Sequence, residues 1–227
     1  MLNIVLYGWF YRQTGLSFTD LNNPIMALKN QIVHESRKLF SLNGFLSTGI
    51  NDIIAASGTS KGGFYNHFSS KEQLFYAVLE ESQNLWRERV LFGIEKIESP
   101  TEKIIAILIN YRDHYLKDTE NFPGGCIFIT FSVELDDTLP QLMEEVNKGF
   151  KGYKRLLTRL LNEAKEANEL FLDTDSEAVA ETIFAGMLGA SVLYGVEKDE
   201  LILDRSINSL IDYVSQLRKE HYLEQNK

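Results

Sequence analysis

The sequence predicts an all-α protein with a three-helix, helix–turn–helix head near the N-terminus and a larger helical body behind it. From Pro24 onward, apolar residues recur at a spacing of about 3.6 residues, as on the buried faces of amphipathic helices. No segment shows the regular alternation of apolar and polar residues that is typical of a half-buried strand. The chain has 227 residues, 44% of them hydrophobic, which is enough for a sizeable core.

Capping and stop residues delimit the first four helices. Thr48 and Ser60, and then Ser69 or Ser70, stand where N-caps are expected, because their hydroxyl groups can accept the free N–H groups of a first helical turn. Gly58 closes the second helix, as glycine commonly does after a last turn. We therefore expect helices over residues 24–43, 49–57, 61–67 and 70–92.

The remainder of the chain reads as five further helices. Residues 126–135 are apolar and β-branched enough to form a buried strand, but we predict a helix there because the neighbouring segments are helical. The proline and glycines of residues 121–125 predict a turn before it. The expected helices cover residues 101–117, 126–135, 140–168, 176–196 and 200–220.

These elements divide the chain into an N-terminal extension (1–24), expected to be poorly ordered, a helix–turn–helix domain (25–72) and a helical domain (73–227). The extension is apolar, but no Lys or Arg precedes its apolar run and no Ala-x-Ala pattern follows, so a secretory signal is not expected. No run of about 18 apolar residues predicts a membrane span, and no membrane partner is expected. The single cysteine, Cys126, excludes an intramolecular disulfide framework and suits a cytoplasmic location.

The net charge is unevenly distributed along the chain. The total is −9, with a pI near 5.0, which taken alone argues against a nucleic-acid partner. Residues 26–72, however, hold five Lys or Arg against three Asp or Glu, a net charge of +2, whereas residues 73–227 carry −11. A mildly basic head on an acidic body is compatible with phosphate contacts made by the head alone.

Residues 50–68 combine two short helices with a tight glycine turn, the pattern of a helix–turn–helix. Apolar side chains, among them Ile53 and Phe64, would pack the two helices together. The second helix would then project Lys61, Tyr65 and Asn66, which offer the charge, hydroxyl and amide groups that contact phosphates and base edges in a major groove. Spacing alone leaves a second interpretation open, an ordinary corner between two helices of an α-protein.

The string from Gly58 to Leu74, GTSKGGFYNHFSSKEQL, resembles the signature of the TetR family of transcriptional regulators. The resemblance is close over residues 27–80 and only architectural beyond them. It implies an N-terminal DNA-binding head, a C-terminal domain that binds a small-molecule effector, and a homodimer on a pseudo-palindromic operator, most often as a repressor. The implied phosphate contacts are Thr48, Tyr65, His67 and Lys71. The implied base-facing residues are Ser60, Lys61, Gly62 and Gly63.

Gly63 departs from the family pattern, which often has Thr, Ser or Ala there. A second glycine beside Gly62 weakens the helix by about 1 kcal/mol relative to alanine and removes one base-reading side chain. Lys61 is therefore expected to carry much of any direct base readout.

The last two helices and the middle of the chain supply candidates for dimerisation and for ligand binding. Small residues on one apolar helix and an apolar stripe on the next predict a dimer interface that contains Gly186, Gly189, Ala190, Leu210, Val214 and Leu217. Packing within the monomer is the alternative. Aromatic and flexible side chains of the middle helices predict an effector pocket lined by Trp86, Tyr111, Cys126, Phe128, Phe131, Met143, Phe150 and Met187.

Other functions find less support in the sequence. Cys126 follows Pro123-Gly124-Gly125 and is expected at the start of a helix, where the helix dipole lowers a thiol pKa, so a thiol-based redox or electrophile sensor is an alternative to a small buried residue. The chain has no P-loop, metalloprotease or nucleophile-elbow motif, and we expect no enzymatic activity, cofactor or metal. A helical ligand-binding protein that no longer binds DNA is a third possibility.

Overall fold

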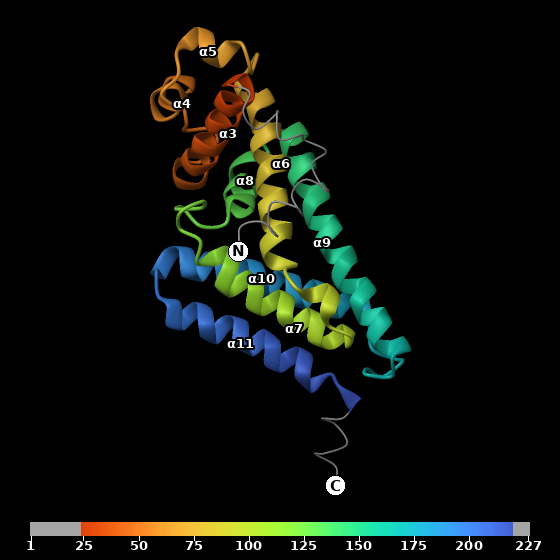
Figure 1. The fold of residues 1–227 in the computed structure, drawn as a ribbon. Coiled ribbons are helices and arrows are strands. Elements are labelled where there is room, and N and C mark those ends of the chain that lie inside the picture. The colour runs from red at the N-terminus through yellow and green to blue at the C-terminus, as the bar shows by residue number, and fades with distance from the viewer. Residues whose placement is uncertain (1–23, 220–227) are drawn as a thin grey trace, which may run out of the picture.

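The computed structural model describes residues 24–219, and its regular elements over that range are helices (Figure 1). Three of them form the head at one end of an elongated molecule: α3 (Pro24–Asn43), α4 (Ile50–Ala56) and α5 (Lys61–Tyr65). The side chains that hold the head together are fully or almost fully buried, namely Ile32, Phe40, Phe45, Ile53, Phe64 and Phe68. The head is thus a small helical unit with its own apolar centre.

The helix α6 (Lys71–Val90) runs from the head into the body. Its N-cap is Ser70, whose hydroxyl oxygen accepts the N–H of Gln73 at 3.2 Å. Leu74, Phe75, Val78 and Leu79 are buried along one side, where α6 packs against α3 and against the body. A short 3-10 turn, η1 (Ile94–Lys96), follows.

The body is a bundle of the remaining helices (Figure 1). It contains α7 (Pro100–Asn110), the π-helix η2 (Tyr111–Leu116), α8 (Ile127–Leu135), α9 (Pro140–Glu166), α10 (Ser176–Glu197) and α11 (Glu200–Gln216). α10 packs against α9 and α11, and α7 lies against both α9 and α11. α10 is the one described helix long and apolar enough to cross a membrane by length and composition, and it serves here as a packed helix of the bundle.

The expected helices agree with the observed ones within a few residues, and residues 126–135 are confirmed as helical. The segment expected as one helix over residues 101–117 changes at Tyr111 from α-helix to π-helix. The last helix ends at Gln216 rather than near residue 220. The predicted N-terminal extension lies outside the described residues, except for Pro24, which begins α3.

The N-cap expected at Thr48 is wrong by one residue. Gly49 is the N-cap of α4, and its N–H donates to the carboxylate of Asp52 at 2.8 Å. The hydroxyl of Thr48 points inward instead and donates to the carbonyl oxygen of Gly44 at 2.6 Å. The acidic side chain three residues into the helix therefore replaces the hydroxyl in closing its first turn.

Candidate DNA-binding face and ligand pocket

The turn between α4 and α5 is built from a left-handed glycine and a serine cap. Gly58 has φ +62°, a conformation that glycine adopts without steric cost. Ser60 is the N-cap of α5, and its hydroxyl oxygen accepts the N–H of Gly63 at 3.0 Å. Phe64 is fully buried and anchors this five-residue helix to the head. A helix too short to be stable alone is thus fixed by one cap and one anchor.

The opposite side of α5 faces solvent. Lys61, Gly62 and Asn66 are exposed, and the ring of Tyr65 is 45% exposed. His67 and Gly63 are half-buried at the edge of this face. The structure therefore places Ser60, Lys61, Gly62, Tyr65 and their neighbours on one accessible surface, with charge, hydroxyl and amide groups available to a nucleic acid.

Two of the predicted phosphate contacts, Thr48 and Lys71, have side chains that are bonded within the protein. The Thr48 side chain is 1% exposed and its hydroxyl is bonded to Gly44, so its predicted side-chain contact to phosphate is corrected. The ammonium group of Lys71 donates to the carbonyl oxygens of Phe45 at 2.8 Å and Thr48 at 3.0 Å. Partial burial lowers the pKa of this lysine. Lys71 thus closes the turn that precedes α4. Its positive charge lies near the DNA-binding face, but its N–H donors are already bonded to main-chain carbonyl oxygens.

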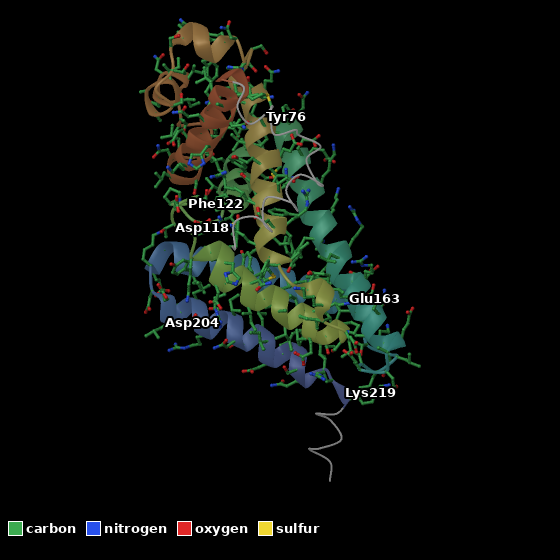
Figure 2. All side chains as sticks on the ribbon, in the orientation of Figure 1. Tyr76, Asp118, Phe122, Glu163, Asp204 and Lys219 are labelled. Atoms are coloured by element: carbon green, nitrogen blue, oxygen red, sulfur yellow. The ribbon has the colours of Figure 1, made fainter. Side chains whose placement is uncertain are left out.

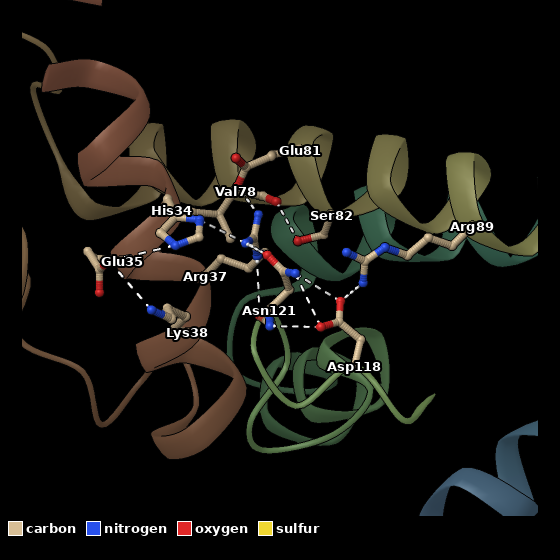
Figure 3. A network of polar contacts seen from close by, with 10 residues as sticks. All are labelled: His34, Glu35, Arg37, Lys38, Val78, Glu81, Ser82, Arg89, Asp118 and Asn121. Atoms are coloured by element: carbon tan, nitrogen blue, oxygen red, sulfur yellow. Dashed lines mark hydrogen bonds and ion pairs between the residues drawn. The ribbon is translucent and has the colours of Figure 1, made fainter. Parts of the chain in front are cut away.

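Arg37, on α3, is the centre of a buried polar network (Figure 3). Its side chain is 1% exposed and reaches Glu81 on α6 at 2.6 Å and the side-chain oxygen of Asn121 at 2.5 Å. Asn121 also donates to Asp118 at 2.9 Å, and Asp118 forms an ion pair with Arg89 of α6. The network ties the head, α6 and the loop after η2 together.

Burial affects the titration of this network. It raises the pKa of the Glu81 carboxyl, and the charge of Arg37 offsets only part of that increase. The Arg37 guanidinium also lies over the ring of Phe122, 5.4 Å from its centroid. Asp118 and Phe122 occupy the space between the head and the body (Figure 2). The positive charge of Arg37 is therefore paired inside the protein and is not available to contact DNA.

A second contact between head and body joins backbone groups to the side chains of Ser41 and Glu134. Gly124 donates its N–H to the hydroxyl of Ser41 at 3.0 Å, and that hydroxyl donates to the carbonyl oxygen of Gly125 at 3.2 Å. A Cβ atom on Gly124 would clash with the main-chain carbonyl of Ser41. On α8, Glu134 accepts the N–H of Phe45 at 2.6 Å. Glycine is thus required at 124 for the close approach of α3 to this loop.

A pocket of about 550 Å³ lies in the body, where the sequence predicts effector binding. Of the eight residues predicted to line it, six do so: Trp86, Tyr111, Cys126, Phe128, Phe150 and Met187. Phe131 does not, because it is fully buried at the junction of head and body, where its ring lies 4.7 Å from that of Phe75. Met143 does not either, because it packs against the core on α9 two residues before Glu145, where the pocket begins on that helix.

Sequence reasoning missed several lining residues, including Tyr153, Phe184 and two glycines of α9. Gly149 and Gly152 lie in the interior of a long helix, where each glycine costs about 1 kcal/mol relative to alanine. These glycines could have been recognised in the sequence as candidate pocket residues, because a glycine kept inside a helix commonly has a packing or functional reason. Here they form part of the pocket wall.

The inner wall of the pocket is uncharged. The hydroxyl of Tyr111 donates to the carbonyl oxygen of Met187 at 3.4 Å, and that of Tyr153 to the Met187 sulfur at 3.0 Å. Burial raises the pKa of both tyrosines, so both remain protonated at neutral pH. Tyr111 also begins the π-helical segment, a kind of distortion that is frequent at functional sites.

Cys126 is the N-cap of α8, as expected, but its thiol is not activated. The residue is 8% exposed, and the hydroxyl of Tyr115 lies 3.5 Å from its sulfur. Burial raises the thiol pKa and outweighs the hydrogen bonds that lower it. The expectation of a lowered pKa is therefore wrong, and the geometry gives the sensor alternative no support.

The residues predicted for the dimer interface divide between two faces of α10 and α11. Ala190 and Val214 are buried within the chain, and a Cβ atom on Gly186 would lie 2.5 Å from Leu210. Ala190 and Val214 are therefore corrected from interface to monomer core. Gly186, Leu210 and Leu217 pack within the chain but are only partly buried, so their place in a dimer interface stays a prediction. Gly189 is exposed with open space around it. It lies in an exposed stripe formed by Ala178, Thr182, Ala185, Gly189, Val192 and Val196.

Known proteins resemble the chain in both parts. The family model described as bacterial regulatory proteins of the tetR family matches residues 32–78, and the tetracyclin repressor-like C-terminal domain model matches residues 100–210. The HTH-type transcriptional repressor DhaR of Mycobacterium sp. (strain GP1) is 25% identical over 186 residues, which cover 82% of this chain and 91% of that protein. QacR of Staphylococcus aureus, an HTH-type transcriptional regulator, is 38% identical over 123 residues, covering 54% of this chain and 63% of QacR.

Solved structures agree over most of the chain. The crystal structure of a TetR transcriptional regulator from Chloroflexus aurantiacus J-10-FL superposes with a TM-score of 0.80 at 30% identity, covering 86% of this chain and 97% of that one. The reduced form of Escherichia coli NemR shares the fold, with a TM-score of 0.71 at 20% identity, covering 85% and 97% of the two chains. This protein belongs to the TetR family of helix–turn–helix transcriptional regulators.

Proposed function

We propose that the chain is a cytoplasmic repressor that binds a pseudo-palindromic operator as a homodimer and releases it when a small molecule occupies the pocket. It acts by binding alone, without enzymatic activity. The observation that carries the proposal is the accessible face of α5, where Lys61 and Tyr65 project from a helix that Ser60 and Phe64 fix to the head. Relatives named as repressors support the direction of control.

Fluorescence anisotropy with labelled duplexes tests the DNA-binding role. DNA from upstream of the protein's own gene is compared with a random duplex of equal length, at several salt concentrations. Lys61→Ala is expected to weaken binding to the specific duplex by about 1–3 kcal/mol and to affect the random duplex less. Lys38→Ala is the matched control, because Lys38 lies on α3 and pairs with Glu35 at 3.6 Å. Equal losses on both duplexes would reduce Lys61 to a phosphate contact.

The helix α8 is the proposed route from pocket to head. At its first turn Cys126 and Phe128 line the pocket, and at its other end Glu134 holds the N–H of Phe45. Phe131 lies between them and packs against Phe40 and Phe75 of the head and of α6. A ligand that displaces the first turn of α8 would therefore also change the position of the head relative to α6.

Removing the contact at the head end of α8 tests this route without a ligand. Glu134→Ala is expected to lower operator affinity, because the turn at Phe45 loses its acceptor, and Glu134→Gln retains an acceptor and should have a smaller effect. Glu163→Ala is the control, since Glu163 lies far from the head on α9 (Figure 2). Unchanged operator affinity in Glu134→Ala would contradict the route.

The homodimer is proposed to form through the exposed stripe of α10. Val192 and Val196 are 47% and 77% exposed, and Gly189 and Ala185 would allow a helix of a second copy to approach closely. Two heads are also needed because one head buries too little surface for specific DNA binding. Sedimentation velocity is expected to show a dimer for the wild type and monomer for Val192→Glu. A dimeric Val192→Glu protein would move the interface elsewhere.

A further inference from the structure

We propose that the pocket takes an amphipathic anion, a ligand with an apolar body and a carboxylate, phosphate or sulfate group at one end. This inference rests on the proposed function, because it names the chemical class of the effector. It is carried by the separation of aromatic and charged groups within one cavity: aromatic rings form its inner wall, and two arginines that have no carboxylate partner in the described part of the chain stand at its mouth.

The inner part of the pocket suits an apolar body. Rings of Trp86 and Tyr153 lie 4.9 Å apart, and those of Phe150 and Phe184 lie 5.3 Å apart, so the wall is continuous aromatic surface. The two buried tyrosine hydroxyls of this wall are bonded to Met187 and remain neutral. A charged group of either sign would therefore lose its hydration there without gaining a partner.

The mouth of the pocket carries an excess of positive charge. Its charged lining residues are Arg87, Lys148, Arg155 and Glu145, three cations against one anion in a chain whose net charge is −9. The single anion is already paired, because Lys148 lies 2.6 Å from the Glu145 carboxylate. The arginines therefore determine the sign of the charge that a ligand meets at the mouth.

Neither arginine has a carboxylate partner among the residues that the structure describes. Arg87 donates only to amide oxygens, Asn84 at 2.6 Å and Gln83 at 3.5 Å. Arg155 is exposed and lines the pocket beside Gly152. One turn further along α9, Arg159 does have a partner, Glu163, at 3.6 Å.

The chemistry of a guanidinium decides between ligand classes. Its planar set of N–H donors matches the two oxygens of a carboxylate or phosphate, and such charge-assisted hydrogen bonds are stronger than neutral ones. An anionic head held by Arg87 and Arg155 would leave its apolar body facing the aromatic wall. A cationic head would meet two like charges at the same place, and a neutral ligand would gain only the apolar contacts.

Isothermal titration calorimetry with matched probes tests the inference. Decanoate, decanamide and decyltrimethylammonium share an apolar chain and differ in head charge, and 2-naphthoate with 2-naphthamide repeats the comparison on an aromatic body. We expect each acid to bind at least about tenfold more tightly than its amide, and the ammonium to bind most weakly. Decyl phosphate beside decanoate identifies the preferred head group. Amides that bind as tightly as the acids, or acids that do not bind at all, overturn the inference.

Variants assign the effect to the mouth of the pocket. Arg87→Gln and Arg155→Gln are each expected to weaken decanoate binding about threefold, and the double variant about tenfold, as partly exposed ion pairs allow. Decanamide binding should not change. Arg159→Gln is the control on the same helix. Unchanged decanoate binding in the double variant contradicts the inference.

Anisotropy titrations of the labelled operator duplex, repeated in the presence of decanoate or decanamide, separate this inference from the proposed function. Decanoate that binds in an arginine-dependent way but leaves operator affinity unchanged would uphold the ligand class and refute the effector role. Decanamide that binds equally well and releases the operator would uphold the effector role and refute the ligand class.

Discussion

The junction between head and body and the ligand pocket are both lined by aromatic rings, but they differ in how the rings are surrounded. At the junction Phe40, Phe45, Phe75 and Phe131 are all within 2% of full burial, and their rings pack against one another, with Phe75 and Phe131 only 4.7 Å apart. In the pocket, rings such as Phe150 and Phe184 are half-buried around a volume of about 550 Å³. In the tightly packed junction a displacement of one ring must move its neighbours, whereas the pocket leaves room for a ligand.

The largest expected difference between the two regions is in stability. Phe131→Ala should lower the free energy of unfolding by about 3–5 kcal/mol, because it leaves a cavity in a filled junction. Phe150→Ala should cost less than about 2 kcal/mol, because its ring already faces an opening. Urea denaturation of both variants measures the difference. Equal losses would show that the pocket is packed as tightly as the junction.

A buried arginine and an exposed one give the next largest difference. Arg37→Met leaves Glu81 without its ion-pair partner and is expected to lower the free energy of unfolding by about 2 kcal/mol near neutral pH. Arg87→Met, at the pocket mouth, should change it by less than about 0.5 kcal/mol. Denaturation at a series of pH values checks both.

The deficit of Arg37→Met should depend on pH. Burial already raises the pKa of Glu81, and loss of Arg37 raises it further, so the folded variant holds a proton more readily than the unfolded chain does. A carboxyl whose folded pKa is raised favours folding at low pH and loses that contribution as pH rises. The deficit should therefore be smaller on the acidic side of neutrality than on the alkaline side. A deficit that grows on acidification would contradict this assignment.

Gly124 at the junction and Gly152 at the pocket extend the comparison of the two regions to the backbone. Gly124→Ala should destabilise the protein by about 1–3 kcal/mol and weaken operator binding, because the new methyl group clashes with the main chain of α3. Gly152→Ala should stabilise α9 by up to about 1 kcal/mol, since the nearest atom to its Cβ is the mobile end of Arg155 at 3.8 Å. Thermal unfolding and operator titration measure both. Stabilisation by Gly124→Ala would exclude the close approach.

The smallest expected effect is on operator affinity when Cys126, which lines the pocket at the start of α8, is alkylated. Its buried thiol should react slowly with iodoacetamide at neutral pH, and the rate should still be rising where that of an ordinary cysteine levels off, because burial raises its pKa. Operator affinity should be the same before and after limited treatment. Rapid alkylation with loss of operator binding would instead support a thiol sensor.

The local features of the fold could be predicted because their causes are local. Gly58, Ser60 and Ser70 stop or cap helices through groups within three residues of themselves. Thr48 shows the limit, because its hydroxyl could either cap α4 or turn inward, and the carboxylate of Asp52 decided the outcome.

The sites were harder to predict because they depend on packing between distant segments. Phe131 and Phe128 are three residues apart on one helix, yet one fills the junction and the other lines the pocket. Their spacing does not contain that distinction, which arises from where α8 lies against α3 and α9. The same holds for Ala190, whose small side chain indicated a close helix contact without indicating whether the partner was α11 or a second chain.

The inward placement of Arg37 and Lys71 bears on how the protein finds its operator. Arg37 is neutralised by Glu81, and Lys71 keeps its charge but has its donors occupied by main-chain carbonyl groups, so few cationic side chains remain free to bind phosphates on the DNA-binding face, and an acidic body stands behind it. Contact with arbitrary DNA should therefore be brief and only weakly dependent on salt, because few counterions are displaced. Such a protein would sample many DNA segments by repeated dissociation, with little one-dimensional sliding, and long residence would be confined to sites that satisfy both heads at once.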